Sequence, residues 1–265
     1  MFPLYTKTFP RTAADLTAQL NESLKRLFSG APNPVAVRDQ SYPEVAEIRI
    51  TLDGAELRLD PPKPPAVKGA SAPALRVGQL HITASDLAIG PAIADLHLVA
   101  RAVALHQAKD SKDEVVLLLQ SAADGRVEIS TTRAELESAI AAVAKSEAGK
   151  QGVTIENVQL MVQERSARSV TAEVQLKGRK LFFSTLIRIS ANLDLDDDLN
   201  ATLSGLTCKG EGAIGTIACS VLAPHLEKLD GRTFPLMALP LGEVRLRDVR
   251  LSAGDKLTVT AEFGA

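Results

Sequence analysis

Val153-Thr-Ile155-Glu-Asn-Val158-Gln-Leu160 is the stretch of sequence that decides the fold. Apolar and polar residues alternate, shift phase by one residue at Asn157, and then alternate again. Alternation indicates a β-strand, because successive side chains point to opposite faces of a sheet. The shift would turn the second pair of apolar residues to the wrong face unless an extra residue bulges out of the strand. The stretch therefore predicts a bulged strand, and a bulge bends a strand and increases its twist.

Three other stretches repeat this pattern. Residues 50–57 change phase at Gly54 and residues 244–251 at Asp248, whereas residues 80–89 carry two extra residues at the shift. Four bulged strands predict a strongly curved antiparallel sheet. A curved sheet has a concave side, and we expect the functional site on that side.

The composition is that of a folded protein, with 45% hydrophobic and 23% charged residues in a chain of 265. The formal net charge of −2 argues against a nucleic-acid partner, because such proteins neutralise phosphates with clustered Lys and Arg. The chain has no Trp, two Tyr and seven Phe. Its interior must therefore be aliphatic, which suits acyl chains as well as an ordinary protein core.

No apolar run reaches the roughly 18–20 residues that span a bilayer, so we expect no transmembrane segment. Residues 1–7 lack the apolar region of a secretory signal. These features predict a cytoplasmic protein, or an envelope protein whose leader has been removed. Cys208 and Cys219 are too few for a disulfide framework, and we expect reduced, buried thiols.

Three segments have the periodicity of amphipathic helices. They cover residues 11–29, residues from Thr131 or Thr132 to Gly149, and residues 211–229. Glu135 stands at capping-box spacing from Thr132, and Pro224 is expected to kink or restart the third helix. Their apolar stripes are the expected lining of a groove, with plain core packing as the alternative for each residue: Leu16, Leu20 and Leu24; Leu136, Ile140 and Val143; Ile214, Ile217 and Val221.

The remaining sequence indicates strands and turns. Turns are expected at Asp124-Gly125, at residues 177–180 and at residues 196–198, so that hairpins pair antiparallel. The proline-rich segment 61–73 is expected to be a long loop between strands. The order of elements predicts an α+β fold in one domain over residues 1–265, in which residues 1–40 hold the N-terminal helix and lead-in and the sheet wraps around two or three helices.

One glycine-rich motif has the spacing of a dinucleotide-binding loop. Gly210-Glu-Gly212-Ala-Ile-Gly215 is followed by a helix that leaves no room for the second parallel strand of such a site. Close packing of the helix on a sheet is the simpler interpretation of these small residues. The free N–H groups at the start of the helix leave a phosphate site open as an alternative.

Other searches for chemistry find no site. Asp194, Asp196 and Asp198 are spaced like calcium ligands but lack the glycine and glutamate that complete such a loop, so we interpret them as a charged turn. The histidines and cysteines have no metal-binding spacing, and no nucleophile motif occurs. The sequence therefore predicts no metal, no cofactor and no catalytic residue.

The C-terminal third resembles a known family. Leu203-Ser-Gly-Leu-Thr-Cys-Lys-Gly-Glu-Gly-Ala-Ile-Gly and Leu239-Pro-Leu-Gly-Glu-Val-Arg-Leu are similar to the end of LmeA-type bacterial domains, and Val127-Glu-Ile-Ser-Thr-Thr-Arg-Ala-Glu-Leu is similar to their strand-to-helix entry. The resemblance covers residues 40–265. It implies a domain similar to tubular lipid-binding (TULIP, BPI-like) proteins, in which a curved sheet and a helix leave an apolar groove. Members of that family are typically exported or lipid-anchored, and this chain shows neither signal.

Together these observations predict a non-enzymatic binder of a lipid or a similar apolar molecule, compatible with peripheral contact to a membrane. The alternative is a structural or protein-interaction domain whose own helices fill the concave face. An enzyme that acts on lipid is the third interpretation. The sequence does not specify the ligand or the oligomeric state.

Overall fold

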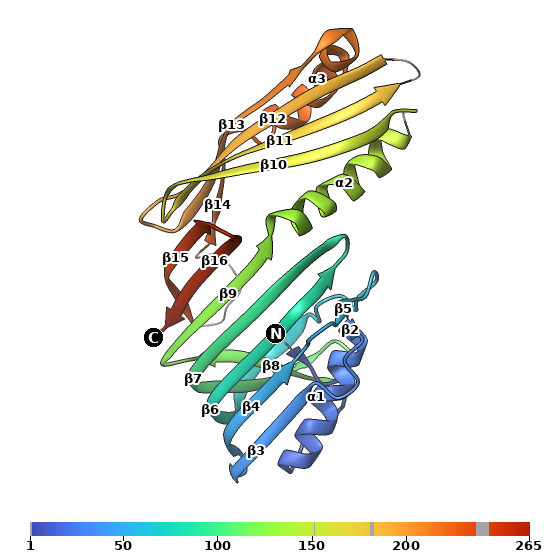
Figure 1. The fold of residues 1–265 in the computed structure, drawn as a ribbon. Coiled ribbons are helices and arrows are strands. Elements are labelled where there is room, and N and C mark those ends of the chain that lie inside the picture. Colours follow the sequence, from blue (N-terminus) through green and yellow to red (C-terminus); the bar gives the residue numbers. More distant parts are fainter. Residues whose placement is uncertain (1, 151, 181–182, 237–243) are drawn as a thin grey trace.

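The computed structural model describes residues 2–150, 152–180, 183–236 and 244–265. Within these residues the chain forms two β-sheets and three α-helices, so the expected α+β class is confirmed. The sequence predicts a single sheet that wraps around two or three helices. Instead, the first helix packs on one sheet and the third helix on the other, whereas the second helix packs mainly on the second sheet and also contacts the first (Figure 1).

The first sheet contains eleven strands, and its main path runs β15–β16–β9–β7–β6–β4–β3. Its strands are β1 (Phe2–Pro3), β2 (Phe28–Ser29), β3 (Val35–Ser41), β4 (Glu44–Thr51), β5 (Glu56–Leu57), β6 (Val67–Ile89), β7 (Ala92–Asp110), β8 (Val115–Ser121), β9 (Asp124–Thr132), β15 (Arg245–Ala253) and β16 (Lys256–Gly264). Helix α1 (Ala13–Leu27) packs against β3. The C-terminal hairpin β15–β16 joins this sheet beside β9, so both ends of the chain contribute to it.

The second sheet lies between β9 and β15 in the sequence. Its five strands follow one another in order: β10 (Thr154–Ser166), β11 (Ser169–Lys180), β12 (Phe183–Leu195), β13 (Asn200–Gly210) and β14 (Arg232–Pro235). Helix α2 (Arg133–Gly149) connects β9 to β10, and α3 (Gly212–Glu227) follows β13. The 17-residue α2 carries the chain away from β9, so β10 starts a new sheet instead of extending the first.

Three of the four predicted bulges are confirmed. The pairing register shifts between Ile155 and Asn157 in β10, between Leu246 and Asp248 in β15, and across residues 84–87 in β6. The fourth pattern is a turn. Strand β4 ends at Thr51, and Gly54, with a φ of 64°, lies in the turn that leads to β5.

Other local predictions need correction. The proline-rich segment 61–73 is a loop only as far as residue 66, because β6 begins at Val67; Pro73 lies at a register irregularity, where the missing N–H is tolerated. Asp124 and Gly125 begin β9 and form no hairpin turn. A Cβ on Gly125 would lie 2.2 Å from the Phe263 ring, so close packing requires this glycine. The sheet is also not purely antiparallel, since β4 and β5 pair parallel to β6.

The helix boundaries agree with the sequence patterns. Thr132 caps α2, and its backbone N–H donates to Glu135 Oε2 at 2.9 Å while its hydroxyl accepts from the Glu135 N–H at 3.2 Å. Helix α3 continues through Pro224 to Glu227. The charged turn at Asp196 is confirmed, because its carboxylate accepts from the Asn200 N–H at 2.8 Å. The antiparallel pairing of β11 with β12 is confirmed too, but residues 177–180, where the sequence predicts a turn, belong to strand β11.

Candidate functional site

The apolar stripe of α1 is completely covered. Leu16 has an exposed fraction of 0%, and Leu20 and Leu24 are also buried. They belong to a core cluster that includes Ile48 and Val77 of the first sheet. These three leucines therefore have no free surface for a ligand, and this part of the sheet is filled by the protein's own helix.

Beyond α1 the same face of the first sheet continues into an exposed apolar region. Leu96 of β7 packs against the α1 core and pairs directly with Ile129 of β9. Val259 of β16 pairs with Ile129 on one side and with Leu251 of β15 on the other. Directly paired residues point to the same face. Ile129 and Val259 are 47% and 44% exposed, whereas Leu251 is buried again. Two exposed aliphatic side chains therefore lie between two buried clusters.

The second buried cluster joins the two sheets. Val249 and Leu251 of β15 pack with Leu195 and Ala201 of the second sheet. The backbone reinforces this junction, since the Leu251 N–H donates to the Ala167 carbonyl at 2.7 Å. In Figure 1 the β15–β16 hairpin lies between the rest of the first sheet and the second sheet. The apolar faces of the two sheets are therefore continuous.

The apolar face extends along the second sheet as half-buried side chains. Leu193 packs against the junction cluster, and the pairing of β11 with β12 is regular, so alternate residues of both strands share its face. We call the partly exposed part of the whole face the apolar strip. It consists of Ile129, Val259, Leu193, Val170, Val174, Leu176, Ile187 and Ile189.

Helix α2 lies along the free edge of β10. Glu137 accepts a hydrogen bond from the Leu160 N–H at 2.7 Å, which satisfies a main-chain donor at the sheet edge. A cavity of about 280 Å³ opens between the helix and Ile155 and Val158 of β10. Of the residues predicted on this helix, Leu136 and Ile140 are half-buried and Val143 is exposed.

Helix α3 is held on the apolar face by a disulfide. Cys208 of β13 is bonded to Cys219 with a Cα–Cα distance of 5.4 Å, and Cys208 pairs with Ile189 of the strip. The expectation of reduced thiols is therefore wrong. Sequence spacing could not reveal the bond, because it depends on α3 folding back onto the strand that precedes it.

The nine residues predicted for the site are thus not brought together. Ile214 is half-buried on α3, while Ile217 is 65% exposed and Val221 is similarly exposed. Helix α1 belongs to the first sheet, and α2 and α3 pack on β10 and on β12–β13 respectively. Only the α2 and α3 residues flank the strip.

The strip was not predicted from the sequence, because its residues lie on strands and the predicted lining lies on helices. The signal was present, since apolar residues alternate in Val127-Glu-Ile129 and in Val170–Leu176. What the alternation could not reveal was which apolar faces remain uncovered. That depends on how far α1 reaches along the first sheet.

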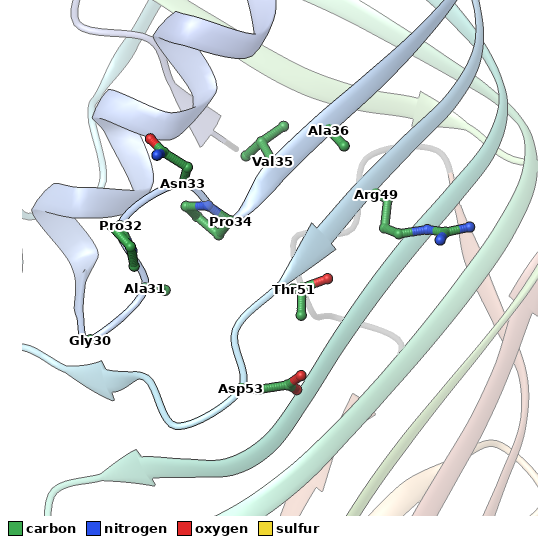
Figure 2. Close-up of a pocket in the computed structure, with 10 residues that line it drawn as sticks. All are labelled: Gly30, Ala31, Pro32, Asn33, Pro34, Val35, Ala36, Arg49, Thr51 and Asp53. Carbon is green, nitrogen blue, oxygen red and sulfur yellow. The ribbon is translucent and has the colours of Figure 1, made fainter.

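Two other cavities are lined in part by charged side chains. Figure 2 shows one of about 380 Å³ between the loop that follows α1 and the side chains of Arg49, Thr51 and Asp53. Asp53 already accepts from the Ser85 N–H at 2.8 Å. A second cavity, of about 510 Å³, is lined by Arg101, which forms an ion pair with Asp124 at 2.9 Å. In both places charged groups are engaged with one another or with backbone, which gives them structural roles.

Ionisable groups with shifted pKa values also have structural partners. At the junction, Arg168 Nη2 lies 2.8 Å from Asp248 Oδ1, and its hydrogen bond holds the pKa of Asp248 below the ordinary range. Burial raises the pKa of Tyr42 to about 12, and its hydroxyl donates to the Pro10 carbonyl at 2.7 Å. Within the described ranges, no three His, Cys, Asp or Glu residues are grouped to hold a metal ion.

Comparison with protein-family models, with curated proteins and with solved structures finds no match to this chain. Among the helices that the structure describes, none is long and apolar enough to cross a membrane.

Proposed function

We propose that the protein binds an apolar ligand, such as the acyl chain of a lipid, along the apolar strip and catalyses no reaction on it. The observation that carries this proposal is the Ile129–Val259 pair, exposed between two buried clusters on one continuous face. Water contact with such side chains is unfavourable by about 25 cal/mol per Å² of apolar area. An acyl chain laid across the pair would remove that area from water.

The bulges support the same proposal. They occur in β6, β10 and β15, strands of the sheets that carry the strip. Because bulges bend strands, we infer that both sheets curve around the strip, with α2 and α3 beside it. This arrangement is what the resemblance to LmeA-type and tubular lipid-binding domains implies, and that kinship is part of the proposal.

The disulfide supports a proposal about the cellular compartment in which the protein is located. Disulfides persist in oxidising environments and are rare where thiol reductants are abundant. The Cys208–Cys219 bond therefore favours an extracytoplasmic location over the cytoplasmic one expected from the N-terminal sequence. A lipid-binding role in a cell envelope is consistent with such a location.

The test compares two variants whose substitutions lie on opposite faces. Ile129→Asn combined with Val259→Asn places polar groups in the strip, whereas Met161→Asn changes a side chain that is also 47% exposed but pairs with Glu173 on the other face of the second sheet. Binding of a fluorescent fatty acid is expected to weaken about tenfold in the double variant and to stay unchanged in Met161→Asn. Equal binding by all three proteins, or no binding by the unmodified chain, would contradict the proposal.

A further inference from the structure

One end of the second sheet lies beside the end of α2 and the start of α3. The Val153 N–H donates a hydrogen bond to the Ala148 carbonyl at the end of α2, and Thr154 pairs with Arg179 in the sheet. At the start of α3, the Glu211 N–H donates to the Leu186 carbonyl. We call this the distal end and define it by residues 145–150, 154–157, 177–179, 184–188 and 207–213. It lies farthest from the β15–β16 hairpin in Figure 1.

The distal end is basic although the chain is acidic. Its residues include six cationic and three acidic side chains, an excess of three positive charges, while the whole chain has a formal charge of −2. The cations are Lys145, Lys150, Lys177, Arg179, Arg188 and Lys209, and the acids are Glu147, Glu156 and Glu211. Charge is therefore unevenly distributed: the distal end has a formal charge of +3, and the rest of the chain has a formal charge of −5.

The ion pairs at this end leave positive charge uncompensated. Glu156 is shared by Lys177 at 3.5 Å and Arg179 at 3.4 Å. Lys145 and Lys209 are exposed, and no ion pair joins either one to an acidic side chain within the described part of the chain. These two lysines are free to meet an external anion.

Apolar surface reaches the same end of the second sheet, on the face opposite to the one that carries Lys209 and Arg188. Residues 212–226 of α3 contain no Asp, Glu, Lys or Arg, and the exposed Ile217 stands about 8 Å along the helix from its first residue. Side chains of a helix tilt toward its N-terminus, which here is the distal end. Leu176 and Ile187 bring the apolar strip to the same end.

We propose that the distal end binds the surface of a bilayer that contains anionic lipids. Lysines attract the negative surface, and Ile217 and the end of the strip meet the acyl boundary, as in other interfacial contacts that combine charge with apolar area. A nucleic acid would use the charge but leave Ile217 facing water, so the bilayer fits both features. Docking in this orientation would place the apolar strip next to the bilayer, from which the strip would take its lipid.

The experiment is co-sedimentation with vesicles of phosphatidylcholine alone and of phosphatidylcholine mixed with phosphatidylglycerol. The unmodified protein is expected to bind only the mixed vesicles, and Lys145→Glu with Lys209→Glu is expected to lower binding about tenfold. The matched control is Lys63→Glu with Lys112→Glu, two exposed loop lysines of the first sheet, which is expected to leave binding unchanged. Ile217→Ser is expected to lower the binding that persists at high salt.

Failure of this inference can be told apart from failure of the proposed function. Fatty-acid binding in solution, without vesicles, is expected to be unaffected by Lys145→Glu with Lys209→Glu. A protein that binds the fatty acid but no anionic vesicle would overturn the membrane contact alone. Equal loss of vesicle binding in both charge-reversal pairs, or binding of RNA in place of vesicles, would overturn it as well.

Discussion

Gly210 of β13 and Gly215 of α3 lie in direct backbone contact: a Cβ on Gly210 would stand 2.1 Å from the Gly215 carbonyl carbon. The spacing that resembles a dinucleotide-binding loop therefore serves helix packing, as expected from the sequence. A Cβ on Gly215 would in turn lie 2.5 Å from Thr185 Oγ1. This contact and the disulfide position α3 at the apolar strip.

Gly210→Ala is expected to destabilise the protein by about 1–3 kcal/mol, because the methyl group forces α3 away from β13. Gly254→Ala is the control, since a Cβ there meets no atom within 4 Å. Urea unfolding measures both. A Gly210→Ala variant as stable as Gly254→Ala would contradict the backbone contact.

Replacing both cysteines by serine is expected to cost about 3 kcal/mol, because the bond closes a loop between residues 11 positions apart and restricts the unfolded chain. Unfolding is compared with and without a thiol reductant. The reductant is expected to lower the stability of the unmodified protein to that of the variant and to leave the variant unchanged. Two free thiols in the non-reduced protein, measured by mass after alkylation, would refute the disulfide.

The Arg168–Asp248 pair predicts an acid-sensitive junction. The pKa of Asp248 is lower in the folded protein than its ordinary value of 3.8. Its stabilising effect is therefore complete above that value and is lost as the pH falls through the lower, folded value. Asp248→Asn is expected to lower the thermal midpoint at about pH 7, and this difference from the unmodified protein is expected to shrink as the pH falls below 3.8.

Asp197 provides the matched control for this prediction. It also contacts Arg168, at 3.0 Å, but its side chain is fully exposed to solvent. Because exposed ion pairs contribute little, Asp197→Asn is expected to leave the midpoint nearly unchanged. If Asp197→Asn lowers the thermal midpoint as much as Asp248→Asn does, the stabilisation does not come from the Arg168–Asp248 pair at the junction.

Leu16 and Ile217 are expected to behave in opposite ways. Leu16→Ala creates a cavity under the first sheet and is expected to cost about 2–5 kcal/mol of unfolding free energy. Ile217→Ala removes exposed atoms and is expected to change stability by less than about 0.5 kcal/mol. Chemical denaturation distinguishes them. Similar losses of stability in the two variants would contradict the exposure of Ile217 on α3.

Local features of the fold could be predicted from the sequence because they depend on neighbouring residues. The capping box at Thr132 and Glu135, the bulges in β10 and β15 and the turn at Asp196 each follow from spacing. Gly54 shows the limit of this reasoning, because a phase shift is produced equally by a bulge and by a turn between two strands.

Features that depend on distant residues could not be predicted. The division into two sheets follows from where α2 directs the chain, and the disulfide follows from how α3 folds back. The lining of the candidate site depends on which apolar residues are covered by other elements of the fold. Leu16 and Ile217 have similar sequence patterns, yet one is buried under a sheet and the other faces solvent.

Photo-crosslinking tests the central claim most directly. A fatty acid with a photoreactive group on its chain is bound to the unmodified protein, irradiated, and located by peptide mass spectrometry. We predict labels on the peptides that carry Ile129 and Val259, and we expect excess unlabelled fatty acid to suppress them. Labels confined to the peptide with Met161 on the opposite face, or spread evenly over the surface, would contradict binding along the apolar strip.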